Sequence, residues 1–305
     1  MKTELSILIP VYNYDCTALA TGLLSELEQL RTAGVQSELI IAEDGSADEA
    51  CLRANSRLAP MPGLRYIRRE HNVGRAAIRN FLARQSQYRW LLFLDCDMQL
   101  PGDRFLRTYL ESEGEEVVDG GFAVRANKPL MGRNLRYTYE WSEQRRHAVA
   151  QRQANPYRSF RTTNFMVRRD IMMSHPFDER FLHYGYEDVL FGKGLRQGGI
   201  TISHIDNPMV LTDVEANDVF MAKTEEALRT LHEFRNDLRG YSRLLTFAEG
   251  IHLRGVTWCI KLWHRLFGTL ERRMLLGNHP GMRLFKLYKI GYYISLTNND
   301  KRQHL

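Results

Sequence analysis

The chain has 305 residues, of which 44% are hydrophobic and 26% are charged, and this composition excludes a disordered or fibrous protein. Its four cysteines are scattered without a CxxC pair, which argues against a zinc knuckle or a disulfide framework and favours a reducing compartment. The first residues lead directly into a predicted strand, and every uncharged apolar run is shorter than the about 20 residues of a membrane span. We therefore expect a cytoplasmic protein without a signal peptide.

The net charge of +6 is unevenly distributed along the chain. Residues 229–305 contain 14 basic and 5 acidic residues, a net charge of +9, whereas residues 1–228 contain 28 basic and 31 acidic residues, a net charge of −3. An asymmetry of this kind indicates a folded body with a charged appendage. We predict one domain over residues 1–228 and a basic, helical C-terminal extension over residues 229–305.

In chain order, the first 97 residues alternate between short apolar strands and helical segments. Strands are predicted at residues 5–11, 38–43, 64–68 and 90–94, and helices lie between them at residues 17–30, 47–59 and 73–85. This alternation predicts an α/β fold, with a mostly parallel central sheet and helices on both faces. Ligands of such sheets bind beyond the carboxyl ends of the strands, where three of these four strands run into polar residues.

The middle of the chain has a less regular pattern. Strands are predicted at residues 117–124, 163–168 and 200–204, and helices at residues 137–151, 187–196 and 214–238. We find no internal repeat and no low-complexity segment.

The fourth predicted strand ends in two aspartates, Asp95 and Asp97. Two carboxylates in an Asp-x-Asp arrangement can approach one hard cation together with the phosphate or ribose that accompanies it. Aspartates at a strand end often only form turns. The apolar residues 91–94 that precede this pair favour the metal-binding interpretation.

Five motifs follow one another along the chain. They are SILIPVYN from Ser6, EDGSAD from Glu43, NVGRAAIRN from Asn72, FLDCD from Phe93 and GYEDVLFG from Gly185. Over about residues 4–215 they resemble the family 2 glycosyltransferases, which are inverting enzymes with the GT-A fold. The fifth motif is especially similar to the ED region of bacterial members that synthesise polysaccharides.

The resemblance implies six nucleotide-binding residues: Pro10, Tyr12, Asp44, Arg75, Arg79 and Asp95. Tyr12 would flank the base, because aromatic rings stack on bases. Asp44 would accept a hydrogen bond from the imide N–H of uracil or guanine, unless it only caps the next helix, a role that Ser46 could also take. Asp95 would lie near the ribose. Arg75 and Arg79, one helical turn apart, would reach the phosphates, although such a charged face is often only solvated.

The resemblance also implies a divalent cation, Mn²⁺ or Mg²⁺, bound by Asp97 and bridging the diphosphate, where it neutralises the leaving group. Relatives often supply a histidine ligand about two dozen residues beyond the ED pair, but here that count reaches Leu211, which cannot bind a metal. His204 is the substitute that we predict, and the alternative is a hydrogen-bonded structural histidine. Thr162 and Asn164 are candidates for lining the sugar pocket.

Asp188 is the predicted general base. An inverting transfer needs one carboxylate to take the proton of the acceptor hydroxyl as its oxygen attacks the anomeric carbon. Glu187 beside it would orient the acceptor or the donor sugar. The alternative is that both carboxylates only stabilise the start of a helix, where the helix dipole favours negative charge.

The C-terminal extension combines apolar and basic residues. Within residues 251–276, six apolar residues recur at intervals of three or four positions, namely Val256, Cys259, Trp263, Leu266, Leu270 and Met274. Basic residues are interleaved with them, and residues 284–294 mix aromatic and basic side chains in the same way. A basic helix with tryptophan suits the surface of a membrane with anionic lipids. Packing against the rest of the chain, or against a partner, explains the pattern equally well.

These observations predict an enzyme, a nucleotide-sugar-dependent glycosyltransferase of the hexosyltransferase class. Its donor would be a nucleoside-diphosphate sugar, with uridine favoured by the resemblance, and its acceptor a glycan or a lipid-linked molecule in surface polysaccharide synthesis. It would be peripheral at the inner face of the cytoplasmic membrane and would bind no nucleic acid, since no such motif is present. The alternative is a non-catalytic or decayed relative that binds a membrane or a partner. A dinucleotide dehydrogenase or a nucleotidyltransferase is disfavoured, because no glycine-rich loop follows the first strand.

Overall fold

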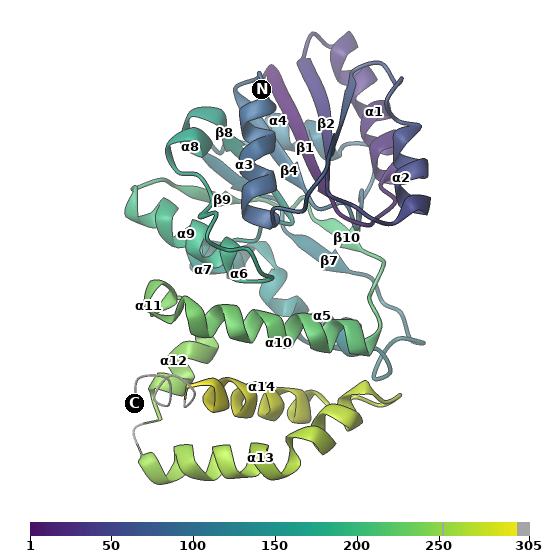
Figure 1. The fold of residues 1–305 in the computed structure, drawn as a ribbon. Coiled ribbons are helices and arrows are strands. Elements are labelled where there is room, and N and C mark those ends of the chain that lie inside the picture. Colours follow the sequence, from purple (N-terminus) through teal and green to yellow (C-terminus); the bar gives the residue numbers. More distant parts are fainter. Residues whose placement is uncertain (252, 298–305) are drawn as a thin grey trace. The chain divides into compact units, whose positions relative to one another are not determined.

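Figure 1 shows the chain in the computed structural model, which describes residues 1–251 and 253–297. The chain divides into two units. The first contains residues 1–125, 145–182 and 191–213, and the second contains residues 126–144, 183–190 and 214–305. The boundary that we predicted after residue 228 falls inside helix α10 (Asn217–Glu233), which is unbroken. The second unit therefore begins before that boundary and also takes in two earlier segments.

The first unit is built on a seven-stranded sheet with the order β3-β2-β1-β4-β8-β6-β9. The strands are β1 (Glu4–Val11), β2 (Gln36–Asp44), β3 (Leu64–Arg69), β4 (Trp90–Leu94), β6 (Val117–Asp119), β8 (Asn164–Arg168) and β9 (Ile202–His204). Only β8 runs antiparallel to its neighbours, β4 and β6; all the other pairs in this sheet are parallel. The predicted mostly parallel sheet is confirmed.

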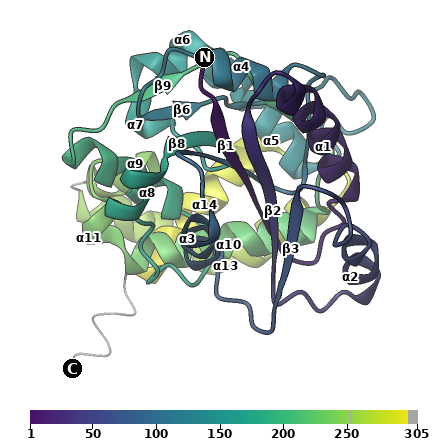
Figure 2. The same cartoon turned by 90° about the horizontal axis from the view of Figure 1, so that it is seen from above.

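Helices cover this sheet because its central strands are apolar on both faces. Residues 5–9 of β1, apart from Ser6, and the whole of β4 are buried apolar side chains, as is typical of parallel strands between helical layers. Figure 2 shows α3 on one side of the sheet, near α8, and α1 and α4 on the other. The helices of this unit include α1 (Thr17–Thr32), α2 (Glu49–Ser56), α3 (Arg75–Gln85), α4 (Phe105–Glu111), α6 (Val149–Ala154), α7 (Pro156–Ser159) and α8 (Arg169–Ser174).

A second, three-stranded sheet consists of β5 (Met98–Gln99), β10 (Met209–Leu211) and β7 (Phe122–Val124). Our single predicted strand at residues 117–124 is therefore wrong. It forms β6 and β7, which pair in different sheets, because the chain turns at Gly120 and Gly121, where Gly121 has a positive φ of 74°. The short strands β5 and β10 were not predicted.

The predicted helix at residues 137–151 is also interrupted. Helix α5 (Leu135–Glu143) is followed by a 3₁₀ turn (Gln144–His147) before α6 begins, and residue 145 is where the chain returns to the first unit. The helical pattern of these residues is real, but it belongs to two helices in two units.

The second unit is helical, as predicted for the C-terminal part of the chain. It contains α5, α10, α11 (Arg235–Leu238), α12 (Arg243–Glu249), α13 (Arg254–Leu276) and α14 (Met282–Leu296). Its core joins α5, α10, α13 and α14 through buried Leu135, Phe220, Met221, Leu275, Phe285 and Tyr288. Glu225 on α10 accepts hydrogen bonds from Arg272 Nε at 2.7 Å and from the Tyr288 hydroxyl at 2.8 Å. Among the described residues, no helix has the length and hydropathy required to cross a bilayer.

Lys289 on α14 generates a prediction about pH. Its Nζ lies 4.9 Å from the ring centre of Tyr139 and 4.6 Å from that of Phe285, and burial lowers the pKa of its ammonium group to about 8. Above that pH, the folded state loses this proton while the unfolded state keeps it up to about pH 10. Because the unfolded state then binds more protons, this group makes the free energy of unfolding rise with pH across that window.

We expect urea denaturation between pH 8 and pH 10 to show this contribution in the wild type, and Lys289→Met to lack it. Arg283→Met, which changes an exposed arginine of the same helix, serves as the control and should keep the wild-type pH dependence. Equal pH slopes for all three proteins would contradict the assignment.

Candidate active site

Three polar segments meet at one edge of the large sheet. β1 lies between β2 and β4 and is parallel to both, with Val11 opposite Glu43 and Leu8 opposite Phe93. The carboxyl ends of the three strands therefore share one edge, where the residues after Val11, around Asp44 and after Leu94 come together. The structure thus collects Tyr12, Asp44 and Asp95 in the first unit.

Tyr12 is the exposed aromatic residue of this edge, with 53% of its surface accessible. The next residue, Asn13, has a positive φ of 49° and ties the first loop to the second. Its backbone N–H donates to Ser46 Oγ at 2.9 Å, and its side-chain oxygen accepts from the N–H groups of Ala47 and Asp48. The loop is thus held by Asn13, which leaves the ring of Tyr12 open to a base. Pro10 lies within β1, opposite Ala42.

Glu43 fixes the second loop from inside the protein. It is fully buried and accepts hydrogen bonds from Asn55 Nδ2 at 2.7 Å, from the Tyr66 hydroxyl at 3.1 Å and from the Ser46 hydroxyl. The following helix, α2, is capped by Asp48, whose carboxylate accepts from the second and third N–H groups of the helix. The capping roles considered for Asp44 and Ser46 are therefore wrong.

Asp44 is buried beside the turn that starts α3. Its carboxylate accepts from the N–H groups of Val73 and Gly74, each at 3.2 Å. Burial raises the pKa of Asp44, while these hydrogen bonds and Arg69, 4.0 Å away, oppose the shift. Gly74 has a φ of 86°, and a Cβ there would lie 3.1 Å from the carbonyl oxygen of Leu182. Through these hydrogen bonds, Asp44 links the start of the third motif, residues 72–74, to the end of β2.

Arg79 differs from its predicted role. Its guanidinium is 1% exposed, donates to Asp95 Oδ1 at 2.9 Å and lies over the ring of Phe177. A buried arginine in an ion pair is not placed to reach a diphosphate at the surface, so we correct the prediction: Arg79 positions Asp95. Arg75, one turn earlier, stands at the first position of α3, and its backbone carbonyl accepts from Arg79.

Two carboxylates, those of Asp213 and Asp97, act on the hydroxyl of Tyr14. The hydroxyl of Tyr14 lies 3.4 Å from Asp213 Oδ2, and burial together with the carboxylates of Asp213 and Asp97 raises the pKa of that hydroxyl. The backbone brings Asp97 and Asp213 to the same region, because β5 begins directly after Asp97 and Leu211 of β10 pairs with Met98 of β5. Asp213 follows Leu211 by two positions. Asp213 thus belongs to the segment in which we looked for a histidine.

Glu187 and Asp188 begin helix α9 (Glu187–Gln197), whose first turn belongs to the second unit. Asp188 Oδ1 accepts from the N–H of Val189 at 2.8 Å, and Glu187 is buried. Two successive residues before the helix have positive φ, Gly185 at 101° and Tyr186 at 70°. Positive φ is a strained conformation for a bulky residue such as tyrosine, and strain of this kind concentrates at functional sites.

The α10 helix holds this strained turn in place within the second unit. Tyr184 N–H donates to Glu226 Oε1 at 3.2 Å, and Thr230 Oγ1 donates to the carbonyl of Tyr184 at 3.1 Å. A Cβ on Gly185 would come within 2.8 Å of the Cβ of Ala227. The turn before Asp188 therefore requires both the glycine and the helix.

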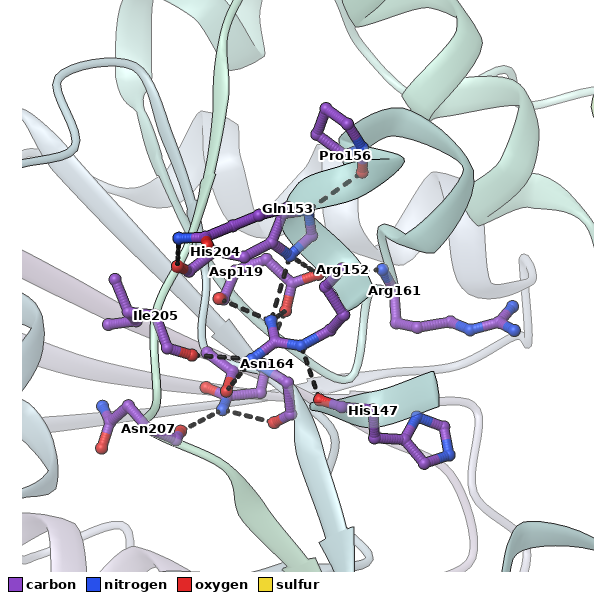
Figure 3. Close-up of polar contacts among 12 residues, drawn as sticks. Asp119, His147, Arg152, Gln153, Pro156, Arg161, Asn164, His204, Ile205 and Asn207 are labelled. Carbon is purple, nitrogen blue, oxygen red and sulfur yellow. Dashed lines mark hydrogen bonds and ion pairs between the residues drawn. The ribbon is translucent and has the colours of Figure 1, made fainter. Parts of the chain in front are cut away.

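His204 lies in a buried cluster around Arg152, shown in Figure 3. Arg152 Nη1 donates to His204 Nδ1 at 3.0 Å, and His204 Nε2 donates to the carbonyl of Pro156 at 3.0 Å. Both ring nitrogens are thus engaged, and the side chain has no exposed surface. The prediction that His204 binds the metal is corrected by these contacts, and the structural alternative holds.

Arg152 binds several chain segments at once. Its guanidinium donates to the carboxylate of Asp119 and to the carbonyl oxygens of Asp119, His147, Gly120 and Ile205, and the side chain is 4% exposed. Asn164, fully buried next to it, donates to the carbonyls of Gly121 and Asn207 (Figure 3). Asn164 therefore supports the loops from inside, and Thr162 is buried as well, so neither side chain lines an open pocket as we had predicted.

Comparison with known families identifies this chain. The family model described as glycosyl transferase family 2 matches residues 6–175, more than half of the chain. The chain belongs to glycosyl transferase family 2. The match spans four of the five motifs and ends before the fifth, which contains Glu187 and Asp188. A curated relative, an uncharacterized glycosyltransferase of Haemophilus influenzae, is 33% identical over 100 residues, or 33% of this chain, and the aligned part spans only 38% of that relative.

Solved structures show the same fold. Staphylococcus aureus TarS, residues 1–349, is 17% identical and superposes with a TM-score of 0.51 over 99% of this chain and 92% of that one. The mannosyltransferase PcManGT of Pyrobaculum calidifontis is 12% identical, with a TM-score of 0.54 over 98% of this chain and 87% of that one. The family 2 chain therefore has the GT-A fold that the motifs predicted.

Sequence reasoning did not single out Asp213, whose carboxylate lies 3.4 Å from the Tyr14 hydroxyl. The count from Asp188 stopped at Leu211 because it sought a histidine at one position. A search for any oxygen donor within two positions of Leu211 would have found it. Arg152 was missed as well, and no local signal marks it, because its partners come from three segments that are far apart in the sequence.

The donor set at this edge fits a divalent cation that is shared with a substrate. In the described part of the chain, no group of three or more acidic, histidine or cysteine side chains could hold a metal alone. Asp97 and Asp213 are oxygen donors that act on one hydroxyl. Mg²⁺ and similar hard cations are commonly bound by one or two carboxylates and completed by substrate phosphates. The residues therefore suit such an ion when a diphosphate is present.

The Arg152 cluster generates a prediction about stability. Arg152→Met leaves the carboxylate of Asp119 buried without its cation, which should cost about 3–5 kcal/mol of unfolding free energy. The double variant Arg152→Met/Asp119→Asn should recover part of the loss, because it removes the buried charge as well. Urea denaturation at neutral pH measures both effects.

Arg158→Met, which changes an exposed arginine on α7, is the control and should cost no more than about 0.5 kcal/mol. If Arg152→Met were as mild as this control, the cluster would not hold the loops.

Proposed function

We propose that this protein is an inverting glycosyltransferase that moves a sugar from a nucleoside-diphosphate donor, a UDP-sugar, to a glycan or lipid-linked acceptor in surface polysaccharide synthesis. We place it in the cytoplasm, peripheral at the inner face of the membrane. The observation that carries the proposal is the convergence of Tyr12, Asp44, Asp95 and Asp97 at the edge of the sheet where such folds bind ligands. Membership of family 2 supports the same activity.

The donor class has support from the solved structures. TarS, at 17% identity and a TM-score of 0.50, has been determined in complex with UDP-GlcNAc, and PcManGT in complex with GDP-Man and Mn²⁺. Uracil and guanine each carry an imide N–H group. A carboxylate at the position of Asp44 can accept a hydrogen bond from that group. The ring of Tyr12 offers a stacking surface for either base.

Asp97 and Asp213 are the residues that would hold the divalent cation, Mn²⁺ or Mg²⁺. When bound, such an ion stabilises the negative charge that develops on the departing nucleoside diphosphate. Asp95, fixed by Arg79, is held at the start of this segment and is available to the ribose.

Asp188 would act as the general base. The acceptor oxygen forms its bond to the anomeric carbon while its proton passes to the Asp188 carboxylate. The bond between the anomeric carbon and the diphosphate oxygen breaks, and the nucleoside diphosphate leaves with the electron pair. Attack on the face opposite the leaving group inverts the anomeric configuration. Glu187, buried at the same helix start, would orient the sugar or the acceptor.

A nucleotide panel tests the donor and the metal. We expect the unfolding temperature to rise with UDP and Mn²⁺ together, because a ligand that binds only the folded state stabilises it, by about 2.7 kcal/mol at a hundredfold excess over its Kd. GDP, dTDP and CDP should give smaller shifts. Asp97→Asn should abolish the Mn²⁺-dependent part of the shift and Asp213→Asn should reduce it.

Asp206→Asn, an exposed aspartate on the connection to β10, is the matched control and should behave like the wild type. A full Mn²⁺-dependent shift in Asp213→Asn would show that Asp213 does not bind the ion. No shift with any nucleotide would favour the non-catalytic alternative.

Replacement of Asp188 tests the chemistry. Asp188→Asn should keep the nucleotide-induced shift but slow the release of nucleoside diphosphate from the preferred donor by about 10²–10⁴-fold, the usual contribution of a general base. Asp218→Asn, which removes an exposed carboxylate at the start of α10, should leave the rate unchanged. Wild-type turnover in Asp188→Asn would refute the assignment of the base.

A further inference from the structure

Helix α13 exposes an unusually large apolar surface for a water-facing helix. Eight of its large apolar side chains are exposed, from 38% to 64% of their surface: Val256, Trp258, Leu262, Trp263, Leu266, Phe267, Leu270 and Met274. Leu253, just before the helix, is 71% exposed. Single exposed apolar residues are normal, but a continuous patch of this kind marks a site of contact with a partner or a membrane.

The exposed patch is separate from the packing face of the helix. The face toward α14 carries the buried residues Gly268, Glu271 and Leu275. Glu271 accepts from Trp263 Nε1 at 2.7 Å, and His264 lies so close to Gly291 of α14 that a Cβ there would come within 2.8 Å of its ring. Within the second unit, Figure 1 shows α14 along one side of α13. Apart from this one hydrogen bond of Trp263, the helix is fixed without the outward residues.

The outward residues follow helical spacing. Val256, Trp263, Leu266, Leu270 and Met274 recur at intervals that place them on one face. Lys261, Arg265 and Arg272 recur on another face. A helix with tryptophan and leucine on one face and basic residues on another is the pattern of helices that lie in the interface of a bilayer.

Charge identifies the occupant of this surface. In the described α13 and α14, the single acidic residue is Glu271, and it is buried. Arg265 and Arg273 on α13, and Arg283 and Lys286 on α14, are exposed. A second copy of the chain would bring the same cations against one another, which is unfavourable. An anionic surface that also accepts apolar side chains matches both the exposed apolar face and the positive charge of these helices.

We propose that α13 is an interfacial helix that binds the surface of a lipid bilayer containing anionic lipids. Its apolar face would enter the boundary between headgroups and acyl chains, and the exposed Arg265 and Arg273 would interact with the negative headgroups. The inference deepens the peripheral location proposed above and rests on that proposal, but it does not depend on the sugar transfer itself.

Vesicle sedimentation tests the inference on the full chain. The wild type should sediment with vesicles of phosphatidylcholine and phosphatidylglycerol in equal parts, and only weakly with phosphatidylcholine alone. Added salt should weaken the binding, because it screens the charges. Leu266→Glu/Leu270→Glu should lower the partition onto anionic vesicles at least about tenfold, since two exposed leucines lose their burial in lipid.

The control carries the same two added charges elsewhere. Met173→Glu/Val219→Glu replaces exposed apolar residues on α8 and α10 and should bind vesicles nearly as well as the wild type. Equal loss in both double variants would show a general charge effect and would overturn the proposal.

Two further results would also overturn it. One is wild-type protein that stays in the supernatant with anionic vesicles. The other is a dimer, seen by sedimentation velocity without lipid, that Leu266→Glu/Leu270→Glu dissociates, which would assign the face to a second copy. The nucleotide-induced thermal shift of the same variants reports on the donor site, so failure of membrane binding and failure of the proposed function are distinguishable.

Discussion

A single buried guanidinium, that of Arg152, holds the loops of the first unit in register. It neutralises the carboxylate of Asp119 and satisfies carbonyl oxygens at the end of β6, in the turn before α6 and in the connection from β9 to β10. Backbone carbonyls that are buried without a partner are costly, so these loops need a donor at this place. The connection from β9 leads into β10, and β10 carries the chain toward Asp213. The position of the second carboxylate therefore depends on a cation that touches no substrate.

The charged residues of the sheet edge divide into two groups by their partners. Glu43 and Arg79 are buried and use their oxygens or nitrogens on neighbouring loops and side chains. Tyr12 is exposed at the same edge, and Asp97 acts on the Tyr14 hydroxyl near Asp213. Preorganisation of this kind is what a site for a charged donor requires, because supports that are already paired do not rearrange when the ligand binds. The motif residues are therefore as much a scaffold as a binding surface.

Periodicity and motif order were enough to predict the sheet, its parallel strands and the polar edge. Three of the four strands up to Leu94, namely β1, β2 and β4, are built around buried apolar residues, and the helices between the strands are amphipathic, so local sequence and tertiary structure agree. The prediction failed where long-range pairing overrides local pattern. Residues 117–124 look like one strand, yet Gly120 and Gly121 divide them between two sheets. His204 looks like a ligand at a strand end, yet Arg152, more than fifty residues away, occupies its Nδ1. Asp213 was hidden because β5 and β10 are too short to be recognised before they pair.

The path of the chain between the two units has a consequence for any attempt to separate them. The chain passes from one unit to the other five times, and Asp188 belongs to the second unit although the sheet edge belongs to the first. A fragment that stops at residue 228 would keep Leu135, Phe220 and Met221 but lose Leu275, Phe285 and Tyr288, which bury them. Such a fragment would expose half of a hydrophobic core and would lack the partners of α10. The helices after residue 228 are therefore part of the architecture that carries Asp188, and deleting them to obtain a minimal enzyme would remove the support of its proposed base.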